Sequence, residues 1–192
     1  MRRFKRRGAV ISSELSADEV QLLDSLLRQL IEMIGTDEDG TPTPEKPADE
    51  NDPFAAWAAE LADDGPVEPP EDPVIKRLLP DAYPHDPKAS AEFRRFTDRD
   101  LRQKKITDAE VALRHLAETD GGQEKLRIPV EEADHWLRAL TSVRLAVAGR
   151  LGIEDGEDAD ELSDLPDDDP RAFMASVYDW LGFAQETLVS AL

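Results

Sequence analysis

Two strongly acidic segments restrict which parts of this chain can form a packed core. Residues 36–72 hold 13 Asp and Glu and one Lys, and residues 152–170 hold 10 Asp and Glu and no Lys or Arg. The overall charge is −20, and these segments contribute −12 and −10, so the remaining residues carry about +2. Residues 36–52 contain too few apolar side chains to offset the entropy of ordering them. We predict a solvating linker there and place the core in the nearly neutral remainder.

The first part of that remainder is predicted to be a strand followed by a helix. Phe4–Ile11 fits a short strand, and Ser16 and Glu19 have the spacing of a capping box at a helix start. Apolar residues then recur at steps of three and four, as on one buried helix face: Val20, Leu23, Leu26, Leu27, Leu30, Ile31 and Ile34. Gly35 suits the position just after the helix.

Four Asp-Pro pairs indicate further helix starts, because Asp caps a helix and Pro suits its first position. They lie at 52–53, 72–73, 86–87 and 169–170. They predict short helices at 53–61 and 73–79, a helical region from 87 to about 118, and a final helix to Leu192. A second capping-box pattern at 107–110 leaves open a kink near residue 106.

Residues 125–151 repeat the strand-then-helix layout, and the two strands could pair in a register that the sequence leaves open. We therefore expect a mostly α (α+β) fold, a single helical domain with a small two-stranded β element and two acidic loops. Residues 1–35 would supply a strand and a helix that join the core, and 36–72 an acidic linker with one short helix. Residues 73–192 would form the helical core, with a short strand at 125–129 and an acidic loop at 152–170.

No pattern in the chain predicts catalytic residues, a metal or a cofactor. Glu132 and His135 have the Glu-x-x-His spacing of di-metal helical bundles, but no second copy of the motif exists. The chain lacks phosphate-binding loops, nucleophile elbows and zincin motifs. It has no cysteine, which excludes disulfides and thiolate metal sites. An enzyme with a carboxylate site remains open as an alternative.

The N-terminus is basic, but it does not resemble a secretion signal. Only Ala9, Val10 and Ile11 form an apolar stretch after it, whereas a signal peptide needs about 7–15 apolar residues. No stretch approaches the roughly 18 apolar residues of a membrane span. We expect a cytoplasmic protein that does not contact the membrane.

Two features are candidates for binding a protein partner. On a continuous helix with about 100° per residue, five cations project from one side within about 140°: Arg94, Arg95, Arg99, Arg102 and Lys105. Phe93 and Phe96 would then point to another side, toward the core. Such a basic side can dock an acidic partner or a phosphate backbone, or it can be a solvated face paired with nearby carboxylates.

The second candidate is Phe183, which falls within the polar stripe of the final helix. A large aromatic residue in this position indicates either a second packing surface or a partner contact. A further basic cluster, at Arg2, Arg3, Lys5, Arg6 and Arg7, lies at the N-terminus.

Three groups of segments resemble one known family. They are Asp72-Pro-Val-Ile-Lys-Arg-Leu-Leu-Pro-Asp-Ala-Tyr-Pro with Glu92-Phe-Arg-Arg-Phe-Thr and Leu101-Arg, His135-Trp-Leu-Arg-Ala-Leu with Arg144-Leu, and Ala175-Ser-Val-Tyr-Asp-Trp-Leu with Gln185-Glu-Thr-Leu. Together they are similar to an actinobacterial domain-of-unknown-function family that includes AosR-like oxidative-stress transcriptional regulators and is often encoded near the Clp adaptor ClpS. The resemblance spans the chain except its acidic linkers.

This resemblance implies a non-catalytic, transcription-associated regulator that acts with a sigma factor or RNA polymerase. An adaptor linked to Clp proteolysis is the alternative that the gene neighbourhood implies. Direct nucleic-acid binding and the oligomeric state remain open. The redox sensing proposed for the family uses cysteine, and because this chain has none, a thiol switch does not carry over.

Overall fold

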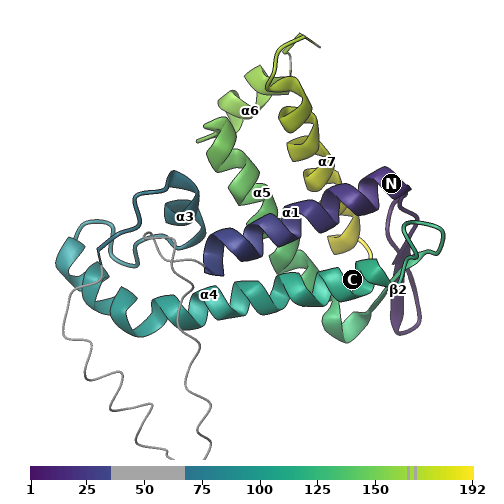
Figure 1. The fold of residues 1–192 in the computed structure, drawn as a ribbon, viewed down its shortest axis with the longest axis horizontal. Helices are drawn as coiled ribbons and strands as arrows, with labels where there is room; N and C mark the ends of the chain where they lie inside the picture. Colours follow the sequence, from purple (N-terminus) through teal and green to yellow (C-terminus); the bar gives the residue numbers. More distant parts are fainter. Residues whose placement is uncertain (36–67, 164, 167) are drawn as a thin grey trace, which may run out of the picture.

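The computed structural model describes residues 1–35, 68–163, 165–166 and 168–192, which form helices around one core beside a small sheet (Figure 1). The elements are β1 (Lys5–Arg7), β2 (Val10–Ser13), α1 (Ala17–Gly35), α3 (Pro73–Leu78), α4 (Pro87–Ala117), β3 (Leu126–Pro129), a 3-10 turn η1 (Val130–Glu132), α5 (Ala133–Leu151), α6 (Gly156–Ser163) and α7 (Ala172–Val189). The mostly helical fold is as predicted. The helix predicted at 53–61 lies outside the described residues.

The sheet has three strands rather than the two predicted. The segment Phe4–Ile11, expected to be a single strand, turns back at Gly8, whose φ of 62° is readily adopted only by glycine. The turn produces an antiparallel hairpin of β1 and β2, and β2 also pairs with β3, placing Ile11 opposite Ile128. The pairing of the two predicted strand segments is therefore confirmed, and it is antiparallel.

Local capping signals determine where α1, α3 and α4 begin. The Ser16 amide donates to Glu19 Oε2 at 2.8 Å, and the Glu19 amide donates to Ser16 Oγ at 3.3 Å, which confirms the capping box. Asp72 accepts from the Val74 amide at 2.7 Å, and Asp86 accepts from the Ala89 amide at 3.0 Å.

The structure decides one boundary that the sequence left open and corrects another. Helix α4 continues through residue 106 to Ala117, so the capping-box pattern at 107–110 starts no new helix. The acidic segment 152–170, predicted to be a loop, contains α6. At its end, Asp169 accepts from the Arg171 amide at 2.8 Å, and α7 starts only at Ala172.

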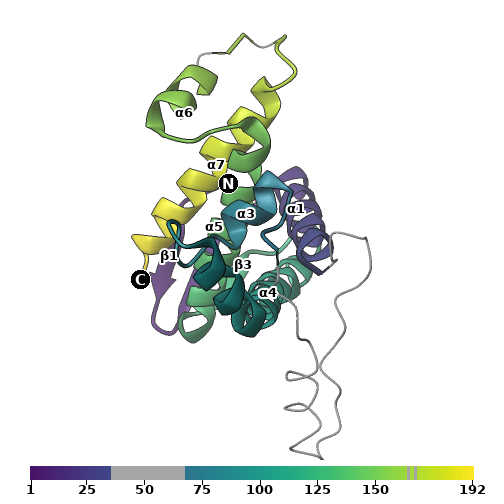
Figure 2. The same ribbon diagram turned by 90° about the vertical axis from the view of Figure 1, so that its left-hand side faces the viewer.

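Helix α5 lies at the centre of the fold and contacts α1, α3, α4 and α7 (Figure 2). Its side chains Trp136, Leu140, Val143 and Val147 are buried in the core. Long α4 packs against both α1 and α5, and α6 packs against α7. The sheet lies at one end of α1, and α3 lies near the other end of α1 (Figure 1).

The turn between α4 and β3 touches the start of α1 at Gly122. A Cβ atom at Gly122 would lie 2.9 Å from the Ala17 nitrogen and 2.9 Å from the Ser16 carbonyl carbon. Neighbouring Gly121 also has a positive φ, but a Cβ there would have no atom within 4 Å.

We predict that Gly122→Ala destabilises the protein by at least about 1 kcal/mol more than Gly121→Ala. Both substitutions carry the left-handed backbone cost of about 1–2 kcal/mol, but only the first forces two backbone segments apart. Denaturant unfolding of the two variants measures the difference. Equal losses would show that this turn does not pack against α1.

Candidate partner-binding site

The buried side of α4 changes in character along the helix. Its 31 residues span about 46 Å at 1.5 Å per residue. Near the C-terminal end it buries apolar Ala109, Ala112 and Leu116 together with Asp108 and His115, whereas toward the N-terminal end its buried residues are the polar Ser90 and Arg94. Polar contacts therefore hold the first half of α4 in place.

Three of the five predicted partner-binding cations are part of this structural contact. Arg94 is 8% exposed and pairs with Asp81 from the segment after α3. Arg102 pairs with Asp98 and donates to the Ile34 carbonyl of α1 at 2.9 Å, which satisfies an acceptor at that helix end. Lys105 Nζ lies 3.5 Å from Ser142 Oγ of α5, and burial lowers the pKa of its ammonium group.

The other predicted residues have different surroundings. Arg95 is half-buried, with its guanidinium carbon 5.4 Å from the centre of the Phe96 ring, and Arg99 is exposed. Phe183 on α7 is half-buried, and the Arg3 guanidinium lies 6.0 Å from the centre of its ring. The structure therefore does not bring Phe183 together with the α4 cations.

The orientation of α4 is also the reverse of the prediction. Phe93 and Phe96, expected to point to the core, are 43% and 63% exposed. The prediction failed because it assumed that the buried side is the apolar one. In this half of α4 the long stems of the arginines and their polar partners fill the inner side instead.

Exposed apolar side chains result on and beside the first half of α4. We call Tyr83, Phe93, Phe96 and Leu101, all of which are exposed, the apolar patch. The Tyr83 and Phe93 rings meet edge to face with centres 6.1 Å apart. Because Asp81 and Ser90 anchor the segment that carries Tyr83 to α4, this patch has a defined shape.

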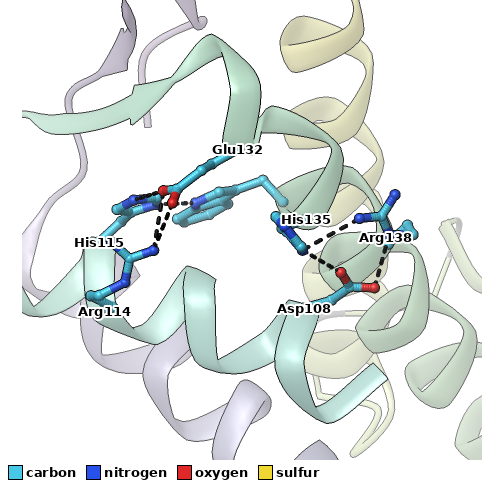
Figure 3. Close-up of polar contacts among 7 residues, drawn as sticks. Asp108, Arg114, His115, Glu132, His135 and Arg138 are labelled. Atoms are coloured by element: carbon cyan, nitrogen blue, oxygen red, sulfur yellow. Dashed lines mark hydrogen bonds and ion pairs between the residues drawn. The ribbon is translucent and has the colours of Figure 1, made fainter. Parts of the chain in front are cut away.

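Two polar clusters join α4 to α5 farther along (Figure 3). In the first cluster, Trp136 Nε1 donates to His115 Nδ1 at 2.9 Å, so the proton of a neutral His115 is on Nε2. That Nε2 lies 2.7 Å from Glu132 Oε2, a close approach without the straight geometry of a hydrogen bond. Arg114 donates to the same carboxylate at 3.0 and 3.1 Å.

The second cluster centres on Asp108, which is buried. Its carboxylate lies 2.6 Å from His135 Nδ1 and accepts from Arg138 Nε at 2.9 Å (Figure 3). Asp108 raises the pKa of the Arg138 guanidinium through this hydrogen bond. Glu132 and His135, which share the spacing of a metal-binding motif, therefore contact different partners.

These clusters support the helix packing more readily than chemistry on a substrate. His115 is 2% exposed, its ring is nearly parallel to that of Trp136 with ring centres 6.4 Å apart, and its Nδ1 accepts the Trp136 hydrogen bond. In the part of the chain that the structure describes, no group of three or more His, Asp or Glu is placed to hold a metal ion. Within the same residues, no helix has the length and apolar character needed to cross a membrane.

A cationic hollow of about 490 Å³ covers the outer face of the sheet. Its cations are Arg2, Arg3, Lys5, Arg7, Lys125 and Arg127. The strand register explains this clustering, because Lys5, Ser12 and Arg127 form one row across the sheet while buried Ile11 and Ile128 face the core. Glu14 pairs with Arg2 at 2.9 Å and with Lys125 at 2.6 Å, and the hydrogen bond from Lys125 lowers the pKa of Glu14.

Comparison with known proteins places the chain in a family. A model of the family described as Domain of unknown function (DUF2017) matches residues 1–192, and the chain belongs to this family. Oxidative stress regulator AosR of Mycobacterium tuberculosis is 32% identical over 208 residues, covering 100% of this chain and 88% of the relative. The protein of the same name from Mycobacterium bovis gives the same values. No solved structure matches the chain. The names of these relatives support a regulatory role.

We predict a pH-dependent contribution of Glu132 to stability. Hydrogen bonds from Arg114 lower its pKa below the ordinary value of 4.5. A lowered folded-state pKa gives stability that is present above about pH 4.5 and lost as pH falls through the folded value. Wild type should therefore melt a little higher than Glu132→Gln at pH 7, by about 2 °C because this carboxylate is solvent-screened. The difference should vanish near pH 3, and a constant difference from pH 3 to 7 would exclude the ion pair as its source.

Proposed function

We propose that this protein is a non-catalytic regulator of the oxidative-stress response that binds a protein of the transcription apparatus, a sigma factor or RNA polymerase. The exposed apolar patch on α4 carries this proposal. The regulatory names of the relatives support it independently.

The patch has the composition of a protein-binding surface. Interface hot spots are enriched in aromatic residues and arginine. Phe93 and Phe96 supply exposed rings, and Arg95 lies over one of them. Polar anchors beneath the patch hold it in place before a partner arrives, which reduces the entropy lost on binding.

We predict that Phe96→Asp removes capture of the partner without unfolding the protein. The change places a charge in an apolar interface. Because position 96 is exposed in the free protein, the new carboxylate is not buried there. Phe173→Asp is the matched control, because Phe173 is 64% exposed on α7, outside the patch. The measurement is crosslinking pull-down from a native host, with quantitative mass spectrometry of recovered RNA polymerase subunits and sigma factors.

The expected result is capture by wild type and Phe173→Asp but not by Phe96→Asp, with equal melting temperatures. Recovery of Clp protease components in place of transcription proteins would assign the patch to the adaptor role. Equal capture by all three proteins would show that α4 is not the binding surface.

A second role, direct contact with nucleic acid, is favoured by the cationic hollow. It contains four arginines, which bind phosphate through paired hydrogen bonds, and Val10 is its one apolar lining residue. Such a surface lacks the apolar centre of a protein interface and fits a phosphate backbone better. Among the described acidic residues, none forms an ion pair with Lys5, Arg7 or Arg127.

The points where the acidic segments join the described chain are distant from this hollow. Helix α1 ends and helix α7 begins away from the sheet, which lies beside the other end of both helices (Figures 1 and 2). Each helix is about 27 Å long, well beyond the screening length of about 8 Å at physiological salt. The hollow can therefore attract an anion although the protein is acidic overall.

We predict that the intact protein binds mixed-sequence duplex DNA weakly at low salt and that Lys5→Glu with Arg127→Glu abolishes this binding. Lys76→Glu with Lys88→Glu is the control, because it changes the net charge equally at exposed sites away from the sheet. Fluorescence anisotropy at two salt concentrations measures both variants, and affinity should fall as salt rises. An equal loss of DNA affinity in the two variants would show that only net charge matters. If the intact protein bound a polyglutamate peptide as tightly as DNA, phosphate recognition would be excluded.

A further inference from the structure

Both internal methionines of this cysteine-free chain line the same hollow. Met33 of α1 and Met174 of α7 are half-buried in the wall of an apolar hollow of about 350 Å³. Leu26, Leu30, Val74, Val143 and Val147 complete most of its lining, from α1, α3 and α5. Thioethers are the side chains in this protein that a peroxide most readily oxidises, because no thiol competes with them.

We propose that Met33 and Met174 form an oxidant-reactive site that alters the apolar patch on α4 through helix α3. This inference rests on the proposed function, because it supplies the signal to which an oxidative-stress regulator without cysteine responds. In the reaction, a methionine sulfur attacks hydrogen peroxide and the O–O bond breaks. One oxygen stays on sulfur as the sulfoxide, and the other leaves as water. Sulfur loses two electrons, and the peroxide is reduced.

The surroundings of Met33 couple this reaction to α3. The Arg150 guanidinium lies 4.0 Å from the Met33 sulfur and donates to Asp72 Oδ2 at 3.1 Å. Asp72 is the residue that caps α3. A sulfoxide oxygen accepts hydrogen bonds far better than a thioether, so it competes with Asp72 for Arg150. The cap of a helix only six residues long then loses a supporting partner.

Oxidation also disturbs the packing of α3 directly. Val74 is fully buried in the wall of the hollow and sits tightly on Gly149 of α5, where a Cβ would lie 3.1 Å from Val74 Cγ2. Placing polar sulfoxides beside this apolar contact costs free energy unless the groups move apart. Helix α3 is the shortest α-helix among the described residues, so it has few residues with which to resist such a shift.

The chain leads from α3 straight to the apolar patch. Within five residues of the end of α3, Asp81 pairs with Arg94, and Tyr83 packs its ring edge to face with Phe93. The Tyr83 backbone also exchanges hydrogen bonds with Ser90 at 2.9 and 3.1 Å. A displacement of α3 would therefore shift Asp81 and Tyr83, which hold and form part of the apolar patch.

The test uses the full-length chain treated with hydrogen peroxide, at a dose that oxidises N-acetylmethionine. Peptide mass spectrometry measures oxygen addition at each methionine, and hydrogen exchange measures opening of residues 73–83. Thermal melting reports the overall effect. Met33→Leu with Met174→Leu removes both sulfurs while keeping the apolar volume nearly constant, and Met1→Leu is the matched control.

We expect sulfoxides at Met33 and Met174, faster exchange at 73–83 and a melting temperature lower by about 2–4 °C. The two methionine sulfoxide reductases, one for each epimer, should reverse these changes. The Met1→Leu protein should respond like wild type, and the double leucine variant should not respond. Unmodified Met33 and Met174, an unchanged exchange rate at 73–83, or an equal response in the double variant would each overturn the proposal. These measurements need no partner, so a negative result here is distinguishable from a negative result in the capture experiment.

Discussion

The packing of α4 against α1 and α5 depends on a buried stripe that is polar over the first half of the helix. Arg94 with Asp81, Arg102 with the Ile34 carbonyl, and Asp108 with Arg138 hold the inner side of α4 along much of its length. Because charged stems occupy this inner side, the phenylalanines of the same half face solvent. One constraint, the pairing of buried cations, therefore both fixes the helix and creates the apolar patch.

Local signals made much of the fold predictable from sequence. Ser16 with Glu19, and Asp72 and Asp86 before proline, start helices through contacts within a few residues, and each was confirmed in the structure. The orientation of α4 could not be predicted in this way. Its determinants are Asp81 and Ile34, which lie outside the helix, and the helix itself has no apolar stripe in that half to indicate its inner side. The hairpin at Gly8 was missed because the basic run before it and the apolar run after it show no strand alternation.

The surfaces of the protein are divided by chemistry. The α4 patch is apolar with adjacent arginines, the outer sheet face is cationic, and the strongly acidic segments join the chain at the far ends of α1 and α7. The regulatory binding role that we propose draws on this division, in a protein whose average composition is simply acidic. The two basic clusters of the sequence differ in the structure. Four cations of the Arg2–Arg7 cluster line the cationic hollow, whereas three of the five α4 cations make structural contacts.

The absence of cysteine from the natural chain allows the orientation of α4 to be measured directly. A single thiol can be introduced either at Ser90→Cys, a nearly isosteric change at a buried position, or at Phe96→Cys, on the outer side. The rate of reaction with a maleimide, compared with the rate after unfolding in denaturant, reports the exposure of each thiol. The thiol of Phe96→Cys should react almost as fast in the folded as in the unfolded protein, while that of Ser90→Cys should be strongly protected until the protein unfolds. Protection at position 96 with free reaction at position 90 would contradict this orientation of α4.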